Sequence, residues 1–138
     1  MIEQTLTIIK PDAVRRGLVG KILARLEDQG FRIRALKLVQ LTKQAAEAFY
    51  QVHAERPFYE SLTTYMSSGP VVPMLLERDD AIQRLRDLMG ATDPQQAAPG
   101  TIRRDYGESI ERNAINGSDA PETAAVEIPF FFNHFERF

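Results

Sequence analysis

The sequence contains no cysteine. This absence excludes disulfides, catalysis by a thiolate and zinc sites built on cysteine. The chain also has no run of eighteen apolar residues, and its first ten residues lack the charged-then-apolar pattern of a signal peptide. We therefore expect neither a membrane span nor secretion, and we expect a cytoplasmic protein.

Glycine-rich phosphate loops are missing as well. Neither G-x-x-x-x-G-K-[ST] nor G-x-G-x-x-G occurs, so a bound nucleotide would have to be held by other groups. The net charge of −2 gives no overall attraction to nucleic acid or to an anionic membrane. The two histidines, His53 and His134, are too few to form a metal site by themselves.

The residues that are present fit one folded unit. With 138 residues, of which 43% are hydrophobic, the chain can build one buried core, and we expect a single domain over residues 1–138. Basic residues outnumber acidic ones between residues 10 and 37, and a second group of arginines lies between residues 84 and 112. Two such groups brought together by folding would suit a polyphosphate, although a solvated helix face is the plainer interpretation.

Hydrophobic periodicity predicts an α+β fold. We expect strands at residues 4–9, 31–41, 71–77 and 110–115, and helices at 18–26, 42–52, 58–66, 79–89 and 121–132. This order predicts a ferredoxin-like βαββαβ domain: a four-stranded antiparallel sheet with helices on one face, extended by a helical hairpin. Residues 91–106 show little periodicity, and an ordered loop of this length is usually functional.

Two prolines complicate this prediction. Pro73 cannot donate a hydrogen bond to a sheet, so we expect it at a free edge or a bulge. Pro129 lies inside the last predicted helix, where an interior proline costs about 3 kcal/mol. We therefore expect a bend or a 3₁₀ ending near Ile128.

Several polar side chains have the chemistry needed to bind a nucleotide. Guanidinium groups bind phosphate oxygens in pairs, a lysine acts as a point charge, and Thr or Asn supplies neutral donors and acceptors. The candidates for phosphate and ribose are Lys10, Arg86, Thr92, Arg103 and Asn113. Each could instead have an ordinary role at a strand end, on an exposed helix face or in a turn.

Phe58 is a candidate for the base. An aromatic ring can stack on any base, because every base has a π face. The alternative is that Phe58 packs in the core with Leu62, four residues further on.

Six short blocks decide between these interpretations. They are Ile8–Val14 (IIKPDAV), Glu55–Phe58 (ERPF), Ser68–Val72 (SGPVV), Met89–Pro94 (MGATDP), Pro99–Arg103 (PGTIR) and Asn113–Asp119 (NAINGSD). In order and spacing the blocks resemble the nucleoside diphosphate kinase family, and the match runs essentially from end to end. The resemblance implies transfer of the γ-phosphate of a nucleoside triphosphate such as ATP to a nucleoside diphosphate, by a ping-pong mechanism through a phosphohistidine.

The resemblance also implies roles for particular residues. Phosphates would be bound by Lys10, Arg86, Thr92 and Arg103, the ribose side by Asn113, and the base at Phe58, with Leu62 and Ile110 also contacting the nucleotide. Tyr50 and Ser118 would approach the catalytic position, and Glu127 would orient the histidine. Mg²⁺ would be held mainly by the phosphates. The resemblance further implies a homo-oligomer, a hexamer or tetramer built from dimers; we favour a hexamer, and only a short tail follows Phe132.

The catalytic position differs from the family pattern. The fourth residue of the NAINGSD block is Asn116, where the resemblance implies the phosphorylated histidine. A carboxamide nitrogen has a delocalised lone pair and is not a nucleophile, whereas a neutral imidazole nitrogen is. We therefore expect binding of Mg-nucleotide without a phosphoenzyme, and Asn116 could still donate to a phosphate oxygen. His53 and His134 do not occupy the motif position.

Two other interpretations stay open. The chain could be a nucleotide-binding or regulatory protein that has the binding cleft without catalysis. It could also be an RNA-recognition module on a similar βαββαβ layout, but the aromatic pattern of such modules is missing and the net charge is negative.

Overall fold

The computed structural model describes all 138 residues and contains one four-stranded sheet. Every neighbouring pair of strands is antiparallel, and the strand order is β2-β3-β1-β4. The central pair is long, because β1 and β3 match over eight residues each. The strands are β1 (Ile2–Ile9), β2 (Arg32–Leu36), β3 (Val72–Asp79) and β4 (Ile115–Gly117). This is the predicted ferredoxin-like α+β architecture.

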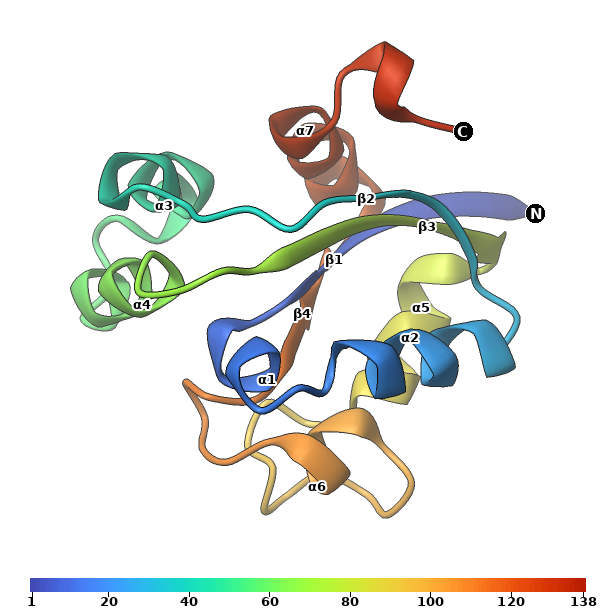
Figure 1. The fold of residues 1–138 in the computed structure, drawn as a ribbon, viewed down its shortest axis with the longest axis horizontal. Helices are drawn as coiled ribbons and strands as arrows, with labels where there is room; N and C mark the ends of the chain where they lie inside the picture. The colour runs from blue at the N-terminus through green and yellow to red at the C-terminus, as the bar shows by residue number, and fades with distance from the viewer.

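Seven α-helices and two 3₁₀-helices surround the sheet (Figure 1). None of them is long and apolar enough to cross a membrane. The α-helices are α1 (Pro11–Arg15), α2 (Val19–Asp28), α3 (Lys43–Phe49), α4 (Tyr59–Met66), α5 (Ala81–Met89), α6 (Ile102–Tyr106) and α7 (Pro121–Phe131), and the 3₁₀-helices are η1 (Gln51–His53) and η2 (His134–Glu136).

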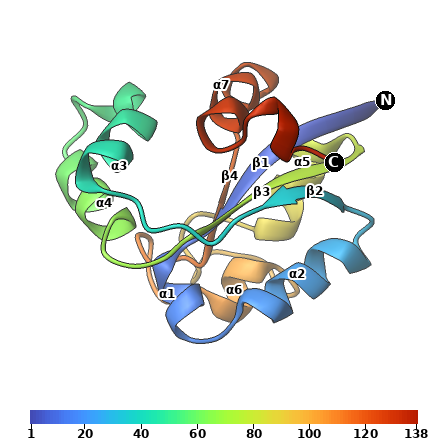
Figure 2. The same ribbon diagram turned by 45° about the horizontal axis from the view of Figure 1, so that its top comes forward.

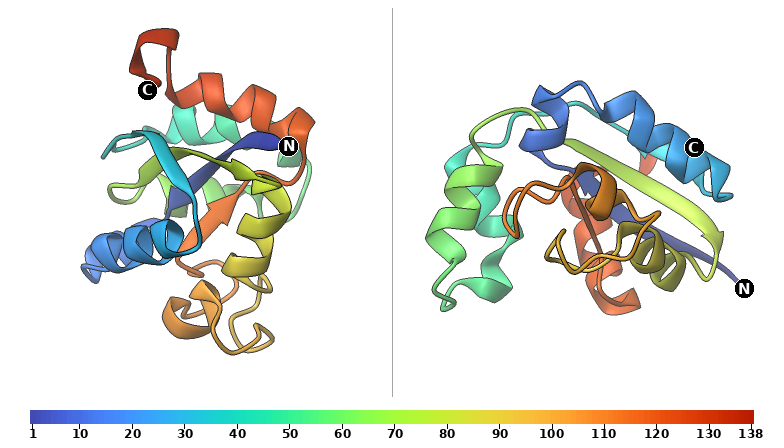
Figure 3. Two further views of the ribbon diagram at one scale, coloured as in Figure 1. Left: turned by 90° about the vertical axis from the view of Figure 1, so that its right-hand side faces the viewer. Right: turned by 90° about the horizontal axis from the view of Figure 1, so that it is seen from below.

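Both faces of the sheet are covered. Helices α2 and α5, the two helices of the βαββαβ core, lie under one face, while α7 lies over the other (Figures 1 and 3). The hairpin of α3 and α4 projects at one end of the sheet (Figure 2), and Phe49 at the end of α3 packs against Phe130 and Phe131 of α7. The alternation of side chains along β1 and β3 supplies an apolar layer to each face.

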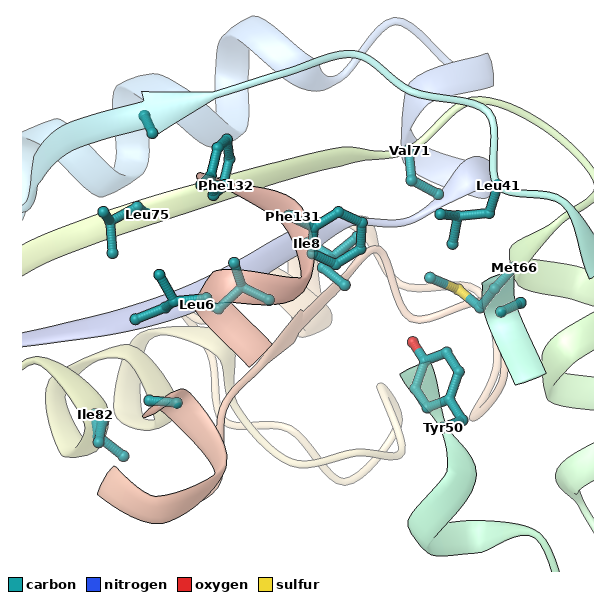
Figure 4. Packing of buried hydrophobic residues seen from close by; sticks show 14 of the residues in the cluster. Leu6, Ile8, Leu41, Tyr50, Met66, Val71, Leu75, Ile82, Phe131 and Phe132 are labelled. Atoms are coloured by element: carbon teal, nitrogen blue, oxygen red, sulfur yellow. The ribbon is translucent and has the colours of Figure 1, made fainter. Parts of the chain in front are cut away.

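The two layers form two hydrophobic clusters. One cluster joins Leu6 and Leu75 of the sheet to Phe131 and Phe132 at the end of α7, and it extends to Tyr50 at the end of α3 (Figure 4). The other joins the opposite face of the sheet to α2 and α5. The first cluster therefore connects the projecting hairpin to the sheet, which fixes one wall of the site described below.

Local signals set several helix ends as predicted. The Thr42 hydroxyl accepts a hydrogen bond from the Ala45 N–H and caps α3. Gly90 ends α5 with a φ of 85°, a conformation that favours glycine. Pro121 occupies the first turn of α7, where its missing N–H costs nothing.

The strand boundaries required correction. The predicted strand at 110–115 is wrong: residues 110–114 are bends and irregular backbone, and β4 begins only at Ile115. The segment 31–41 is regular only over β2, followed by a single bridge between Val39 and Val71. Strand β3 continues to Asp79, so α5 begins two residues later than predicted. The expected irregular loop 91–106 ends in the short helix α6.

The predictions for both prolines were wrong. Pro73 lies in β3, an interior strand, and the only bulge in β2 lies at Ile33/Ala35. The proline is tolerated because the β2 ladder has just ended there, and only its carbonyl is used, as acceptor for the Lys37 N–H. Helix α7 continues past Pro129 to Phe131. The proline cannot donate to the Ala125 carbonyl, but both residues lie on the exposed side of the helix, where water can satisfy that carbonyl.

Candidate functional site

A cavity of about 610 Å³ opens between the α3–α4 hairpin, the end of α5 and the β1–β4 edge of the sheet. Its volume is in the range of small-molecule and cofactor sites. Eleven of the twelve predicted site residues line it: Lys10, Tyr50, Phe58, Leu62, Arg86, Thr92, Arg103, Ile110, Asn113, Asn116 and Glu127. The twelfth, Ser118, lies behind the wall and contacts Glu127. Residues from distant parts of the sequence therefore meet in one cavity.

Strand pairing places Asn116 on the cavity wall. Asn116 lies opposite Ile8 in the β1–β4 ladder, and directly opposed residues project to the same face of a sheet. Both side chains line the cavity. The Thr7 hydroxyl also donates to the Asn116 carbonyl, 2.5 Å away. The backbone at residue 116 is thus fixed, and Asn113, predicted on a strand, lies instead in the turn before β4.

Lys10 is the deepest cation of the site, with only 3% of its surface exposed. Its Nζ donates to the Asn113 Oδ1 at 2.9 Å and to the Glu111 carbonyl at 2.6 Å. Burial lowers the pKa of Lys10 to about 8, partly offset by the carboxylate of Asp12. Lys10 is therefore mostly charged at neutral pH but is poorly neutralised by the protein, which suits a residue that binds an anion.

Two arginines extend this positive region. Arg103 is buried and donates to the carbonyls of Gly90 and Ile115, at 2.9 and 2.8 Å, while its Nε has no partner. Burial lowers the pKa of Arg103 to about 10, so it stays charged at neutral pH. Arg86 is half exposed and donates to the Asp119 carboxylate at 2.8 Å. The site thus combines one rigidly held guanidinium with one that is open to solvent.

The groups around Asn116 form a short polar chain. The Asn116 Nδ2 donates to the Tyr50 hydroxyl at 3.1 Å, and the Ser118 hydroxyl donates to the Glu127 carboxylate at 2.6 Å. Burial raises the pKa of Tyr50, which keeps its hydroxyl protonated, and burial also raises the pKa of Glu127. The Asn116 side chain is therefore held by a phenol, and the pair of Ser118 and Glu127 adds a carboxylate to the same site.

The mouth of the cavity is apolar. Phe58 is 47% exposed and Ile110 is 61% exposed, and they come from the hairpin and from the loop before β4. The Phe58 ring lies 5.4 Å from the His53 ring, measured between centroids. Leu62 is partly buried and packs against the first hydrophobic cluster, and it also lines the cavity. Leu62 therefore belongs both to the core and to the cavity wall.

Three lining residues with charged or titratable side chains had no predicted role. Asp119 stands inside the quoted NAINGSD block, and its pairing with Arg86 depends on a contact across 33 residues that the block does not reveal. Glu111 supplies a carbonyl to Lys10, which no side-chain pattern can indicate. His53 lines the mouth beside Phe58, and its position five residues before Phe58 gave only a weak signal.

Comparison with known proteins gives this cavity a context. The family model described as nucleoside diphosphate kinase matches residues 3–137. The nucleoside diphosphate kinase of Desulfosudis oleivorans is 61% identical over 135 residues, which cover 98% of this chain and 97% of that protein. The chain belongs to the nucleoside diphosphate kinase family. The enzyme of Bordetella pertussis is 59% identical over 131 residues, which cover 95% of this chain and 93% of that protein.

Solved structures of nucleoside diphosphate kinases show the same fold. The Aquifex aeolicus enzyme has a TM-score of 0.99 at 48% sequence identity, and each chain is fully covered. The Halobacterium salinarum enzyme, solved in complex with CDP, has a TM-score of 0.96 at 41% identity. The match covers all of this chain and 92% of the Halobacterium chain. The fold and the family of this nucleoside diphosphate kinase homologue are thus established together.

Proposed function

We propose that the cavity binds nucleoside di- and triphosphates with Mg²⁺, on a scaffold built to transfer the γ-phosphate from ATP to a nucleoside diphosphate through a phosphohistidine. As written, the chain does not form that intermediate, because Asn116 stands at the position of the histidine. The observation that supports this proposal is the location of Asn116: it lines the same cavity as the cations Lys10, Arg86 and Arg103, and its side chain donates to the Tyr50 hydroxyl.

The cavity matches a nucleotide along its length. The apolar mouth at Phe58 and Ile110 suits a base, which would stack without selecting among bases. The interior carries Lys10, Arg86 and Arg103, which suit a polyphosphate because each would gain a charged partner. Thr92 and Asn113 would supply neutral contacts to phosphate and ribose. The polar chain of Tyr50, Asn116, Ser118 and Glu127 would then lie beside the terminal phosphate.

Mg²⁺ would enter with the nucleotide. No group of three His, Asp or Glu side chains is arranged to hold a metal ion. Mg²⁺ often keeps several waters and binds through substrate phosphates, so it needs no cage of protein ligands. Bound in this way, the ion would offset phosphate charge, while Lys10 and the two arginines fix the position of the phosphates.

Residue 116 decides whether phosphate is transferred. In the histidine form, an imidazole nitrogen would attack the γ-phosphorus, the bond from that phosphorus to the β,γ-bridging oxygen would break, and the nucleoside diphosphate would leave. Glu127 would orient the ring from its other nitrogen. An amide offers no such nucleophile, but its N–H can donate to a phosphate oxygen. We therefore expect nucleotide affinity to be retained while phosphotransfer is lost or nearly lost.

The test combines binding and labelling. Calorimetry with Mg-ADP and Mg-ATP should show binding by the chain as it stands, and γ-labelled ATP should leave no label on the protein. The Asn116→His variant should retain label and transfer it to added nucleoside diphosphate. Asn133→His makes the same change at an exposed position outside the cavity and is the matched control, which should stay unlabelled.

Two results would contradict the proposal. Label retained by the unaltered chain would show that another group accepts the phosphate. Failure of the chain to bind either nucleotide would remove the function itself. The alternative, a nucleotide-binding or regulatory relative without catalysis, shares the binding result, and it is favoured if Asn116→His binds nucleotide but still transfers nothing.

We further propose a homo-oligomer built from dimers, a hexamer or a tetramer. Strand β2 lies at the edge of the sheet, and Leu36 and Leu38, in and just after it, are 49% and 68% exposed. The Arg34 carbonyl of β2 accepts from the Phe138 N–H, but no strand pairs with this edge, and an edge with exposed apolar side chains is suited to pairing with a second copy. Light scattering at several protein concentrations would give the mass, and a monomer at all concentrations would refute the assembly.

A further inference from the structure

A buried carboxylate outside the predicted site connects three distant segments. Asp12, in α1, is 1% exposed. Its Oδ2 accepts a hydrogen bond from the Ala114 N–H at 3.0 Å, and its Oδ1 accepts one from the Tyr65 hydroxyl. The Asp12 N–H in turn donates to the Tyr65 oxygen at 2.7 Å. Asp12 thereby joins α1 to α4 and to the segment before β4. Arg16 approaches the same carboxylate to 3.7 Å.

The segment that Asp12 holds is strained. Ala114 has a φ of 75°, and the Ile115 N–H donates to the Asn113 carbonyl, which closes a tight three-residue turn. An L residue rarely adopts this conformation, and it persists only where its surroundings enforce it. Asp12 binds the N–H of Ala114, and the Lys10 N–H binds its carbonyl at 2.9 Å. Both polar groups of the strained residue are thus fixed by the first block of the sequence.

The turn sets the direction of two site residues. Asn113, before it, accepts from the Lys10 Nζ and donates to the Thr92 carbonyl, both at 2.9 Å. Asn116, two residues after it, enters the β4 ladder facing the cavity. Without the turn, the chain could not present both side chains to the same cavity from opposite sides of Ala114.

Asp12 also acts on Lys10 through its charge. Burial disfavours the charged form of Lys10 and the nearby Arg103 adds to this effect, whereas the carboxylates of Asp12 and Glu111 oppose it. Two further cations, Arg15 and Arg112, lie over the Tyr65 ring that Lys10 also approaches. Asp12 is the stronger of the two carboxylate influences on Lys10.

We propose that Asp12 is a positioning residue of the phosphate-binding site: it holds the strained turn at Ala114 in place and supplies a negative charge near Lys10. The proposal rests on the nucleotide-binding function, since it concerns how that site is built. It assigns Asp12 no contact with the substrate.

The test measures nucleotide affinity as a function of pH in three proteins. These are the unaltered chain, Asp12→Asn, and Asp105→Asn, a matched change of an Asp that pairs with Arg25 outside the cavity. Asp12→Asn should weaken Mg-ADP binding about tenfold at neutral pH, because the amide offers one uncharged acceptor where the carboxylate offers two charged ones to the Ala114 N–H and the Tyr65 hydroxyl. As the pH is raised, the affinity of Asp12→Asn should also begin to fall at a lower pH than that of the unaltered chain. The reason is that the pKa of Lys10 decreases when the carboxylate charge is removed, so Lys10 loses its proton earlier. Asp105→Asn should match the unaltered chain in both respects.

The outcomes separate the two levels of inference. If the unaltered chain does not bind Mg-ADP, the proposed function fails first. If it binds, and Asp12→Asn has a lower melting temperature but the affinity and pH profile of Asp105→Asn, Asp12 is only structural and the proposal is overturned. Should Asp12→Asn not fold, Tyr65→Phe replaces it, because it frees Oδ1 while keeping the charge. That variant should bind at least about twofold more weakly with an unchanged pH profile, and affinity equal to the control would overturn the proposal.

Discussion

Replacing Lys10 by methionine tests the electrostatic cost of the site. The pKa of Lys10 falls from 10.5 to about 8 on folding. At about 1.36 kcal/mol per pKa unit, this shift corresponds to about 3 kcal/mol of stability lost at neutral pH. The sign follows from proton binding: between pH 8 and 10.5 the unfolded chain binds more protons at this residue than the folded chain does, so stability rises with pH across that window.

The magnitude can be measured as a difference between two proteins. Integrating the linkage relation with these two pKa values, the stability of the unaltered chain relative to Lys10→Met should increase by about 2 kcal/mol between about pH 7 and about pH 9.5. Subtracting the variant removes the titration of the other groups. The hydrogen bonds of Lys10 to Asn113 and Glu111 are lost in the variant at both pH values, so they cancel from the pH-dependent part.

Urea unfolding followed by circular dichroism at the two pH values supplies the four free energies required. Lys21→Met, at an exposed position of α2, is the matched control for the change of side chain. A relative stability that is the same at both pH values, within about 0.5 kcal/mol, would refute the reasoning. It would mean that Lys10 is neutralised in the folded protein by groups that the geometry does not show.

Two further substitutions test the packing around the site. The Thr5 hydroxyl is fully buried in β1 without a hydrogen-bond partner, so Thr5→Val should stabilise the protein by about 1 kcal/mol, measured by urea unfolding; a loss of stability would show that the hydroxyl is satisfied. Gly117 has no room for a side chain, since a Cβ there would lie 2.7 Å from the Leu85 Cδ2 and 3.0 Å from the Met89 Cε. Gly117→Ala should therefore cost about 1–3 kcal/mol in the same assay, and an unchanged midpoint would show that α5 moves aside freely.

The parts of the fold that were predicted correctly depend on local signals. Helices α2 and α5 have apolar residues at helical spacing, and Gly30 and Gly90 follow their ends. The apolar alternation of β1 and β3 is likewise local to each strand. These signals arise within a few residues of one another, so a single sequence contains them in full.

The misplaced fourth strand shows where local signals end. Residues 110–115 include two isoleucines and read as a short strand, yet only Ile115–Gly117 pairs with β1. A strand of three residues containing Asn116 and Gly117 has little intrinsic β propensity. Its conformation is set by the ladder to Thr7, Ile8 and Ile9, more than a hundred residues away in the sequence, which no periodicity can reveal.

The residues of the site likewise divide into those that could be predicted from the sequence and those that could not. The family resemblance carried by six ordered blocks named twelve site residues, and eleven of them line the cavity, although other lining residues such as Asp119 and Glu111 were missed. The supporting contacts were not predictable, because each depends on a partner known only from the fold. The Ala114 N–H and its acceptor Asp12 are 102 residues apart, and the Arg86 and Asp119 side chains are 33 apart.

The features of the site that lower the stability of the protein do not include Asn116. Three features of the cavity reduce the stability of the protein without a ligand: the buried charge of Lys10, the strained turn at Ala114 and the unpaired Nε of Arg103. All three lie on the phosphate-binding side, and a bound polyphosphate would compensate at least the two cations. Asn116, in contrast, has a hydrogen-bond partner in Tyr50 and lies in unstrained strand geometry. On the proposed function, an amide at position 116 in place of an imidazole would therefore remove a nucleophile without relieving any of these costs, and binding and phosphotransfer would be physically separable in this cavity.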